Sequence, residues 1–148
     1  MADTTFNADT AASDMAVIDR IHQFNRFGMK LGLERMDGLL KKLGSPQEGL
    51  QVIHVAGTNG KGSVSKFLEE GLKACGYKMG LYTSPFIERF NERIRFDGED
   101  ISDNDLEVFG RRVIAAAEEM VSEGLESPTE FEVVTAIAFL YFKEKDTD

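Results

Sequence analysis

The chain has 148 residues, of which 42% are hydrophobic and 29% are charged. This size and balance fit one ordinary globular domain and exclude disorder over most of the length. The 26 acidic and 17 basic side chains give a net charge of −9, which argues against a nucleic-acid-binding protein. A single cysteine, Cys75, excludes an internal disulfide and favours a reducing, cytoplasmic setting. No apolar run is long enough for a membrane span, and the N-terminus lacks the charged-then-apolar order of a signal peptide.

The charge is distributed unevenly along the chain. Residues 1–96 hold 13 basic and 11 acidic side chains, whereas residues 97–148 hold 4 basic and 15 acidic ones. We therefore expect an anionic ligand to bind in the first part, while an acidic, solvated face is the plain explanation for the second.

Two helices are expected before residue 50. Residues 1–14 are small and polar, and we interpret them as a flexible leader. Apolar residues at helical spacing then predict a helix over 17–24, with Ser13 or Asp14 as its N-cap. A loop with two glycines is predicted over 27–35. A second helical stripe follows it, formed by Met36, Leu39, Leu40 and Leu43.

The middle of the chain predicts alternating strands and helices. The segment 52–55 is β-branched and bounded by glycines, which is typical of a buried strand. A glycine-rich loop over 57–63 follows it, then a helical pattern over 64–72 and a second apolar run over 79–83. Strand, loop, helix and strand form a βαβ unit. We therefore predict an α/β fold whose sheet is parallel.

The last third predicts one short strand and two helices. Arginines alternate with apolar residues at the end of 86–96, which favours a short exposed strand there. Ser102 and Asp105 have the spacing of a helix start, and an amphipathic pattern follows them. A last, largely apolar helix is predicted over 129–141.

The strongest chemical signal is the loop between the expected strand and helix, formed by Gly57, Thr58, Asn59, Gly60, Lys61, Gly62 and Ser63. Glycines allow successive N–H groups to point at one anion, and the helix N-terminus adds positive potential at the same place. Lys61 would reach terminal phosphate oxygens, and Ser63 would place a hydroxyl on Mg²⁺. The spacing differs from the common G-x-x-x-x-G-K-[ST] loop, and a glycine-rich turn without a ligand is the alternative.

The sequence around this loop, VIHVAGTNGKGS, resembles the nucleotide loop of the Mur-ligase superfamily, specifically of folylpolyglutamate synthase and bifunctional dihydrofolate synthase. KLGLERM at 30–36 is similar to the family's substrate loop. LYTSPFIERFNERIR at 81–95 is similar to its Ser-Pro segment and the arginine-containing loop that follows. PTEFEVVTAIAF at 128–139 resembles the start of its next helix. Together the resemblance covers about residues 15–145.

The resemblance implies a P-loop-type parallel sheet flanked by helices, the Mur-ligase ATP-binding domain, whose N-terminal part would be residues 15–148. It implies ATP and Mg²⁺ as cofactors and folate or dihydropteroate with L-glutamate as partners, with no role for nucleic acid or a membrane. The oligomeric state stays open, with a monomeric parent as one option. The choice between dihydrofolate synthesis, polyglutamate extension and both stays open as well.

The resemblance also implies roles for individual residues. Residues 57–63 would hold the triphosphate, and Lys61 would act as a catalytic residue by stabilising the γ-phosphoryl group as it moves. Magnesium would bind Ser63 and Ser84. The substrate pocket would be formed by Leu31, Gly32, Leu33, Glu34, Arg35, Ser84, Pro85, Thr129 and Phe131, with the ring of the last as a stacking face.

Several of these residues also have a plain structural explanation. Thr129 and Glu132 have the spacing of a helix capping box, which is compatible with a place in the pocket. Ser84 is equally a turn residue before Pro85.

The remaining basic residues are open to two interpretations. These arginines, Arg89, Arg93 and Arg95, would either contact phosphates and glutamate tails or lie on the solvent-exposed face of a strand. His22 and His54 are expected to be structural.

Members of the family continue beyond the point at which this chain stops. Their next segment has the form E-x-G-x-G-G, and further magnesium ligands and a C-terminal domain follow it. We therefore interpret the chain as an N-terminal fragment and expect it to be inactive as a ligase alone. Two alternatives are another Mur-type ligase acting on a cell-wall precursor, and a non-catalytic nucleotide-binding or interaction module.

Overall fold

The computed structural model describes residues 17–24 and 32–148. Residues 17–23 are helical, and the elements that follow are α2 (Glu34–Lys42), α3 (Lys61–Ala74), β1 (Gly80–Tyr82), the 3-10 helix η2 (Phe90–Arg93), β2 (Ile94–Phe96), β3 (Glu99–Asp100), α4 (Asp103–Ser122) and α5 (Glu130–Glu144). The predicted leader over 1–14, the N-cap candidates Ser13 and Asp14, and most of the predicted loop over 27–35 lie outside the described residues.

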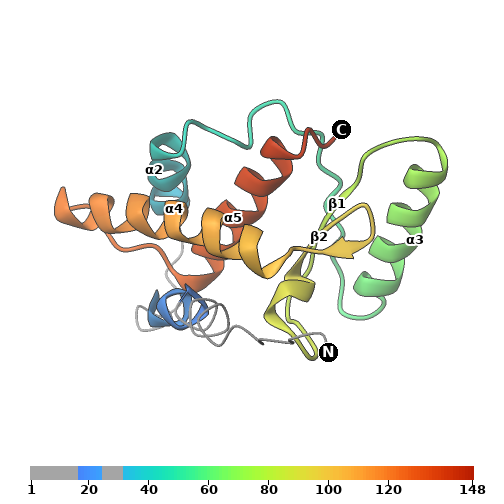
Figure 1. Cartoon of the computed structure of the whole chain (residues 1–148), viewed down its shortest axis with the longest axis horizontal. Coiled ribbons are helices and arrows are strands. Elements are labelled where there is room, and N and C mark those ends of the chain that lie inside the picture. Colours follow the sequence, from blue (N-terminus) through green and yellow to red (C-terminus); the bar gives the residue numbers. More distant parts are fainter. Residues whose placement is uncertain (1–16, 25–31) are drawn as a thin grey trace, which may run out of the picture.

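The helix over 17–23, α2, α4 and α5 form the body of the molecule, and α5 lies against both α2 and α4 (Figure 1). The four helical stripes predicted from the sequence in this body are confirmed. None of the helices in the described part of the chain is long and apolar enough to cross a membrane. The core between them includes Val17, Ile21, Leu39, Leu106, Val113, Met120, Val133 and Ile137.

The two long helices begin at the N-caps that the sequence predicts. The Ser102 side chain accepts a hydrogen bond from the Asp105 amide at 3.0 Å. At the start of α5, the Thr129 hydroxyl accepts from the Glu132 amide at 3.3 Å, and the Glu132 carboxylate accepts from the Thr129 amide at 2.7 Å. The predicted capping box is confirmed, and it satisfies donors that a helix end leaves open.

The sheet corrects the predicted topology. Its three strands have the order β1-β2-β3, and both pairs are antiparallel, with Leu81 opposite Arg95 and Arg95 opposite Asp100. The predicted strands near 79–83 and 94–96 are confirmed, but the described residues form no parallel pair. Ile94 is buried, so the second strand is less exposed than predicted. Pairing differs because 97–98 form a tight turn between β2 and β3, whereas a parallel ladder needs a crossover to a distant strand.

The predicted strand over 52–55 is not formed in this structure. Residues 51–57 have no regular secondary structure, and Val52 and Ile53 have 68% and 60% of their surface exposed. Among the described residues, β1 pairs only with β2, and no strand lies in register with 52–55. A β-branched run becomes a strand only where a neighbouring backbone completes its hydrogen bonds.

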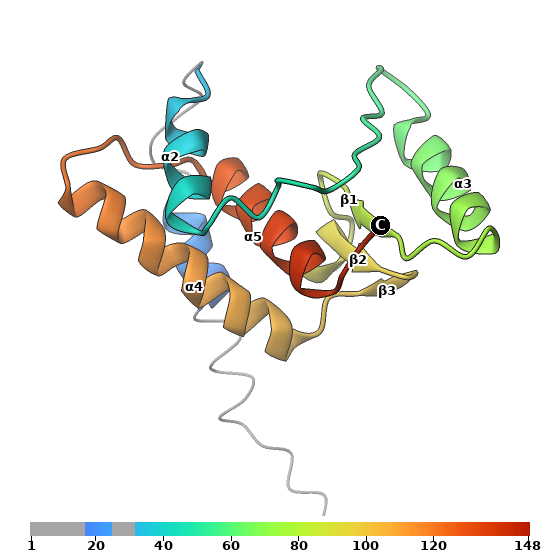
Figure 2. The same cartoon turned by 90° about the horizontal axis from the view of Figure 1, so that it is seen from above.

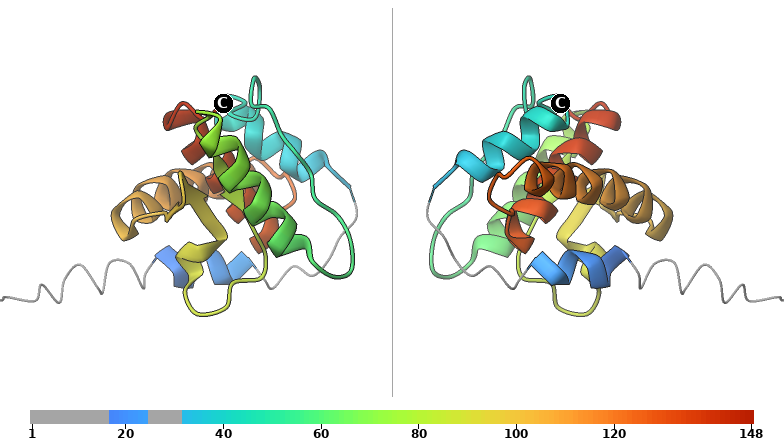
Figure 3. Two further views of the ribbon diagram at one scale, coloured as in Figure 1. Left: turned by 90° about the vertical axis from the view of Figure 1, so that its right-hand side faces the viewer. Right: turned by 90° about the vertical axis from the view of Figure 1, so that its left-hand side faces the viewer.

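Helix α3 stands apart from the helical body, with β1 and β2 between them (Figures 1 and 2). In the left view of Figure 3, α3 lies in front of the helical body. In the right view, which looks from the opposite end, the helical body lies in front of α3. The predicted helix is confirmed, but its apolar stripe points outward: Phe67 is 77% exposed, and Val64 and Leu68 are also exposed.

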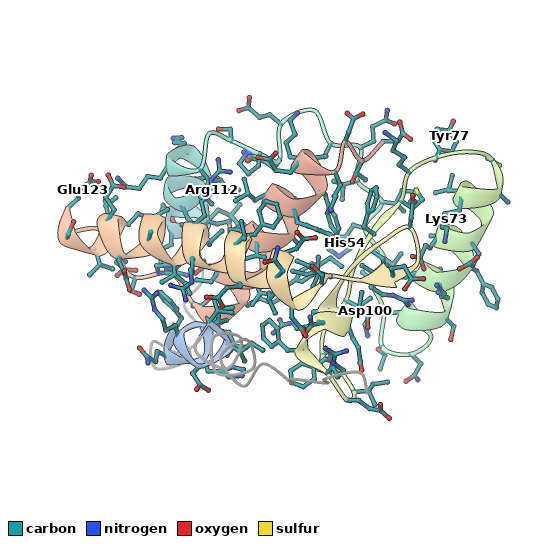
Figure 4. The ribbon with its side chains drawn as sticks, in the orientation of Figure 1. His54, Lys73, Tyr77, Asp100, Arg112 and Glu123 are labelled. Atoms are coloured by element: carbon teal, nitrogen blue, oxygen red, sulfur yellow. The ribbon has the colours of Figure 1, made fainter. Side chains whose placement is uncertain are left out.

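Polar contacts attach α3 to the rest of the molecule. The Lys73 ammonium donates to the Asp97 carbonyl at 2.6 Å, and Figure 4 shows Lys73 on the side of α3 that faces the β2–β3 turn. Within the helix, Lys66 binds Glu69 at 2.6 Å, and Glu69 is only 1% exposed. The helix therefore turns a polar face inward and an apolar face to the solvent, which is the reverse of an ordinary amphipathic helix.

Candidate nucleotide and substrate site

The glycine-rich loop runs directly into the N-terminus of α3. Its first and fourth residues adopt positive φ angles, 149° at Gly57 and 77° at Gly60, which side chains with a Cβ rarely adopt. Gly60 is the N-cap and offers no side-chain oxygen to the helix. The first amides of α3 therefore receive no side-chain cap, and a helix N-terminus in this state attracts an anion.

Lys61 folds back over this loop. Its ammonium donates hydrogen bonds to the carbonyls of Gly57 at 2.6 Å and Thr58 at 3.3 Å. All seven loop residues from Gly57 to Ser63 are exposed. The Lys61 ammonium thus bonds to the backbone of its own loop. The Lys61 side chain would have to break these hydrogen bonds and turn outward to reach a phosphate oxygen.

Ser84 and Pro85 follow β1 and are exposed. The segment after them is organised by Glu92, whose carboxylate accepts from the amides of Ile87 at 2.9 Å, Glu88 at 3.1 Å and Arg89 at 2.9 Å. These hydrogen bonds, first the one from Ile87, lower the pKa of Glu92 below its ordinary value. Glu92 was not singled out from the sequence. Its position three residues after Arg89, the N-cap of η2, is nevertheless the spacing of a capping box.

The predicted substrate residues at 31–35 separate into two groups. Leu31 lies outside the described residues, and Gly32, Leu33 and Glu34 are exposed. Arg35 is instead buried in α2, where it binds Glu132 and Glu126. The hydrogen bond to Glu132 raises the pKa of Arg35 further above its ordinary value.

Thr129 and Phe131 lie together at the start of α5. Thr129 is the half-buried N-cap, whereas the Phe131 side chain is 56% exposed. The Phe131 ring lies 6.1 Å from the Tyr82 ring of β1, centroid to centroid, and the Tyr82 hydroxyl bonds to Thr135 at 3.2 Å. The Phe131 ring therefore packs beside β1 while more than half of its surface stays open to solvent.

The basic residues that the sequence left open are mostly paired. Arg89 binds Asp103 and Arg95 binds Asp100, both at 3.1 Å. Arg93 is buried and binds Glu130 at 3.2 Å. The expectation that it lies on a solvent-exposed strand face is therefore wrong. Both histidines are exposed, but their surroundings differ. His22 contacts Glu130 at 3.1 Å, whereas His54 lies on the irregular segment before the glycine-rich loop.

The oxygen donors of the site limit what metal it would hold. Within residues 17–24 and 32–148, no three His, Cys, Asp or Glu side chains gather into a metal site. Ser63 and Ser84 offer exposed hydroxyl oxygens, which suit Mg²⁺ when phosphate oxygens and water complete its octahedron. The donor set therefore fits a nucleotide-bound magnesium ion and does not fit a metal held by protein alone.

The start of α3, the segment after β1 and the start of α5 lie on the same, lower side of the molecule in Figure 1. These three segments, which are far apart in the sequence, therefore lie on one side of the fold.

Comparison with models of known protein families gives no match. Comparison with individual proteins does. The chain is 44% identical over 124 residues to the dihydrofolate synthase/folylpolyglutamate synthase of Bacillus subtilis, covering 84% of this chain and 29% of that protein.

Solved structures agree with the sequence comparison. A folylpolyglutamate synthase (FPGS) in complex with AMPPCP and folate matches with a TM-score of 0.85 and 42% identity, over 91% of this chain and 33% of that one. The Mycobacterium tuberculosis FPGS, complexed with ADP and AMPPCP, matches with a TM-score of 0.84 and 32% identity, over 95% of this chain and 31% of that one.

These matches and the glycine-rich loop define an α/β protein of the Mur-ligase class. The chain spans about a third of the length of the relatives it matches. Over that span it belongs to the folylpolyglutamate synthase and dihydrofolate synthase family.

Proposed function

We propose that this chain supplies the phosphate-binding loop and part of the folate pocket of an ATP-dependent ligase that adds L-glutamate to folate or dihydropteroate. The observation that carries the proposal is the uncapped, glycine-rich start of α3, combined with 42% identity to an FPGS bound to AMPPCP and folate. Position and chemistry agree, because the triphosphate needs N–H donors and the loop presents them.

The reaction makes an amide from a carboxylate and an amine. A carboxylate oxygen attacks the γ-phosphorus of ATP, the bond to the β-phosphate oxygen breaks, and ADP leaves. The glutamate nitrogen then attacks the acyl carbon, phosphate leaves, and the nitrogen loses a proton. A carboxylate is a poor acyl donor, and phosphate provides it with a leaving group.

Each residue of the site has a proposed task in this reaction. The amides of residues 57–63 bind the triphosphate, and Lys61 leaves its own loop carbonyls to neutralise charge on the γ-phosphoryl group. Bound magnesium would lower the charge on the phosphate oxygens, and Ser63 and Ser84 are the side chains that would hold it. The folate pocket is formed by Thr129, Phe131, Pro85 and residues 31–35.

We also propose that the fold is completed by more polypeptide. Residues 15–148 would be the N-terminal part of an ATP-binding domain, and the exposed segment 52–55 would join a P-loop-type parallel sheet flanked by helices. The exposed apolar side chains of 52–55 and of α3 support this, because a further strand would cover both. The relatives offer that polypeptide, since about two thirds of their length lies outside the match.

Calorimetric titration with AMPPCP and Mg²⁺ tests the nucleotide part of the proposal. We expect the 148-residue chain to bind, and Lys61→Met to weaken binding by about tenfold or more because a charge-assisted contact to phosphate is lost. Lys41→Met, an exposed lysine in the last turn of α2, is the matched control and should bind as the wild type does. Equal binding by both variants would contradict the proposal.

Ligation assays test the substrate part. We expect no glutamate addition by the 148-residue chain, and ATP-dependent addition to dihydropteroate or tetrahydrofolate by a version extended to the length of its relatives. A preference of the extended protein for a muramyl substrate would instead assign it to cell-wall synthesis. Nucleotide binding without ligation of any of these substrates would favour a non-catalytic module.

A further inference from the structure

The first turn of α5 carries an aromatic ring between two buried acids. Glu130, Phe131 and Glu132 are consecutive, and the side chains of both glutamates are close to nine-tenths buried. Successive residues of a helix are about 100° apart, so the two carboxylates point to nearly opposite sides and the ring projects between them. Buried carboxylates are costly unless paired, and each of these has its own arginine.

Arg35 of α2 holds the second carboxylate. Its Nε and Nη2 atoms each donate to a different oxygen of Glu132, both at 3.2 Å, which is the paired geometry that makes arginine–carboxylate contacts directional. The same carboxylate accepts from the amide and the hydroxyl of Thr129 at 2.7 and 3.0 Å. Glu132 is thereby fixed from α2 and from the N-cap of its own helix.

Arg93 of η2 holds the first carboxylate. Its Nη1 atom lies 3.2 Å from one oxygen of Glu130, and Nδ1 of His22 lies 3.1 Å from the other. The Phe90 ring supports both partners: its centroid is 5.4 Å from the Arg93 guanidinium and 5.8 Å from the His22 ring centre. Glu130 is thereby fixed from two further elements, the helix over 17–23 and η2.

The structure assigns Arg35 and Arg93 a role as positioning residues. By fixing the carboxylates on either side of Phe131, they set the angle of its ring against Tyr82 and so prepare a flat face for the fused ring system of folate. This inference rests on the proposed function, because it concerns the same pocket. It goes beyond it by assigning the control of ring stacking to the pairs that these two arginines form with Glu132 and Glu130.

A double-mutant cycle with two ligands tests the role. Folate carries the fused rings, and p-aminobenzoylglutamate is the same molecule without them. We expect Arg93→Gln to weaken folate binding by about tenfold or more while binding of p-aminobenzoylglutamate and of AMPPCP is unchanged; Arg93→Lys should recover part of the loss. In a Phe131→Leu background, Arg93→Gln should cause little further loss, because both changes remove the same stacking face.

The matched control is Arg112→Gln, which breaks another arginine–glutamate pair of α5, with Glu144 at 3.3 Å. Figure 4 shows Arg112 on α4, away from the first turn of α5. This variant should bind both ligands as the wild type does. Additive losses in the cycle, or folate binding by Arg93→Gln at the wild-type level, would overturn the inference.

A measurement without ligand separates this inference from the proposed function. In the wild type, nuclear Overhauser contacts between the rings of Phe131 and Tyr82 should be strong, and Arg93→Gln should lose them while AMPPCP still binds. If the wild type binds no folate but the ring contacts depend on Arg93, the folate assignment is wrong and the positioning role stands. If the contacts survive the substitution, the positioning role is wrong.

Discussion

Glu92 accepts three backbone hydrogen bonds and holds the segment that follows Ser84 and Pro85. Because these bonds favour the ionised carboxylate, its pKa in the folded protein is lower than the ordinary 4.5. A lowered folded-state pKa contributes stability that is fully present above the unfolded-state pKa and is lost as the pH falls through the folded-state pKa. The contribution of Glu92 to the stability of this segment is therefore expected to be lost at acid pH.

We expect Glu92→Gln to lower the free energy of unfolding at pH 7, and the difference from the wild type to shrink as the pH falls below about 4.5. Urea unfolding at a series of pH values from neutral to acidic measures this difference. Glu88→Gln, at an exposed neighbouring position, is the control and should show no such dependence. A difference between Glu92→Gln and wild type that stays constant with pH would contradict the expected linkage.

Gly80 and Gly71 differ in how tightly the surrounding atoms are packed. A Cβ on Gly80 of β1 would lie 2.7 Å from the Phe142 ring of α5, whereas a Cβ on Gly71 of α3 would meet nothing within 4 Å. We expect Gly80→Ala to destabilise the protein by about 1–3 kcal/mol through overpacking. Gly71→Ala should stabilise α3 by up to about 1 kcal/mol, since alanine is the better helix former. Thermal and urea unfolding of both variants would show the opposite signs, and equal signs would contradict the assigned packing.

Among the elements, α4 depends on its N-cap. The Ser102 hydroxyl satisfies the Asp105 amide, and its loss should cost about 1 kcal/mol of unfolding free energy in Ser102→Ala. Ser122→Ala, at the exposed far end of the same helix, should change the unfolding free energy by less than about 0.5 kcal/mol. Urea unfolding compares the two, and an equal cost at both ends would mean that the N-cap bond contributes nothing specific.

Elements and site residues could be predicted from the sequence where their causes are local. Helices α4 and α5 depend on caps three residues apart, and the glycine loop depends on adjacent residues, so both were visible in the sequence. The state of 52–55 depends on whether another strand lies alongside, which no local pattern contains. Arg35 appeared as a substrate residue, and its carboxylate partner at Glu132 lies 97 positions away, so only the fold reveals the pairing.

At the scale of the whole molecule, α3 and the segment before it expose several large apolar side chains. Phe67, Val64 and Leu68 are exposed on this helix, and Val52 and Ile53 are exposed on the segment before it. Exposed apolar surface promotes association. We expect the 148-residue chain to self-associate with rising concentration, and Phe67→Ser to reduce this association without lowering the unfolding midpoint. Sedimentation velocity and thermal unfolding measure the two properties.

The control for that experiment is Val108→Ser, which removes a similarly exposed apolar side chain from α4. If association runs through the α3 side, this variant should associate as the wild type does. An equal reduction by both substitutions would point to general surface hydrophobicity instead.

The polar attachment of α3, through the hydrogen bond from Lys73 to the Asp97 carbonyl, also has a kinetic consequence. Buried apolar contacts set which parts of a protein open last, and α3 contributes none of the side chains of the main core. Its amides should exchange with deuterated solvent through local opening, while those of α5 should exchange only when the whole chain unfolds. The helical body would then assemble first, and the glycine-rich loop at the start of α3 would gain its shape late, as the last step of folding.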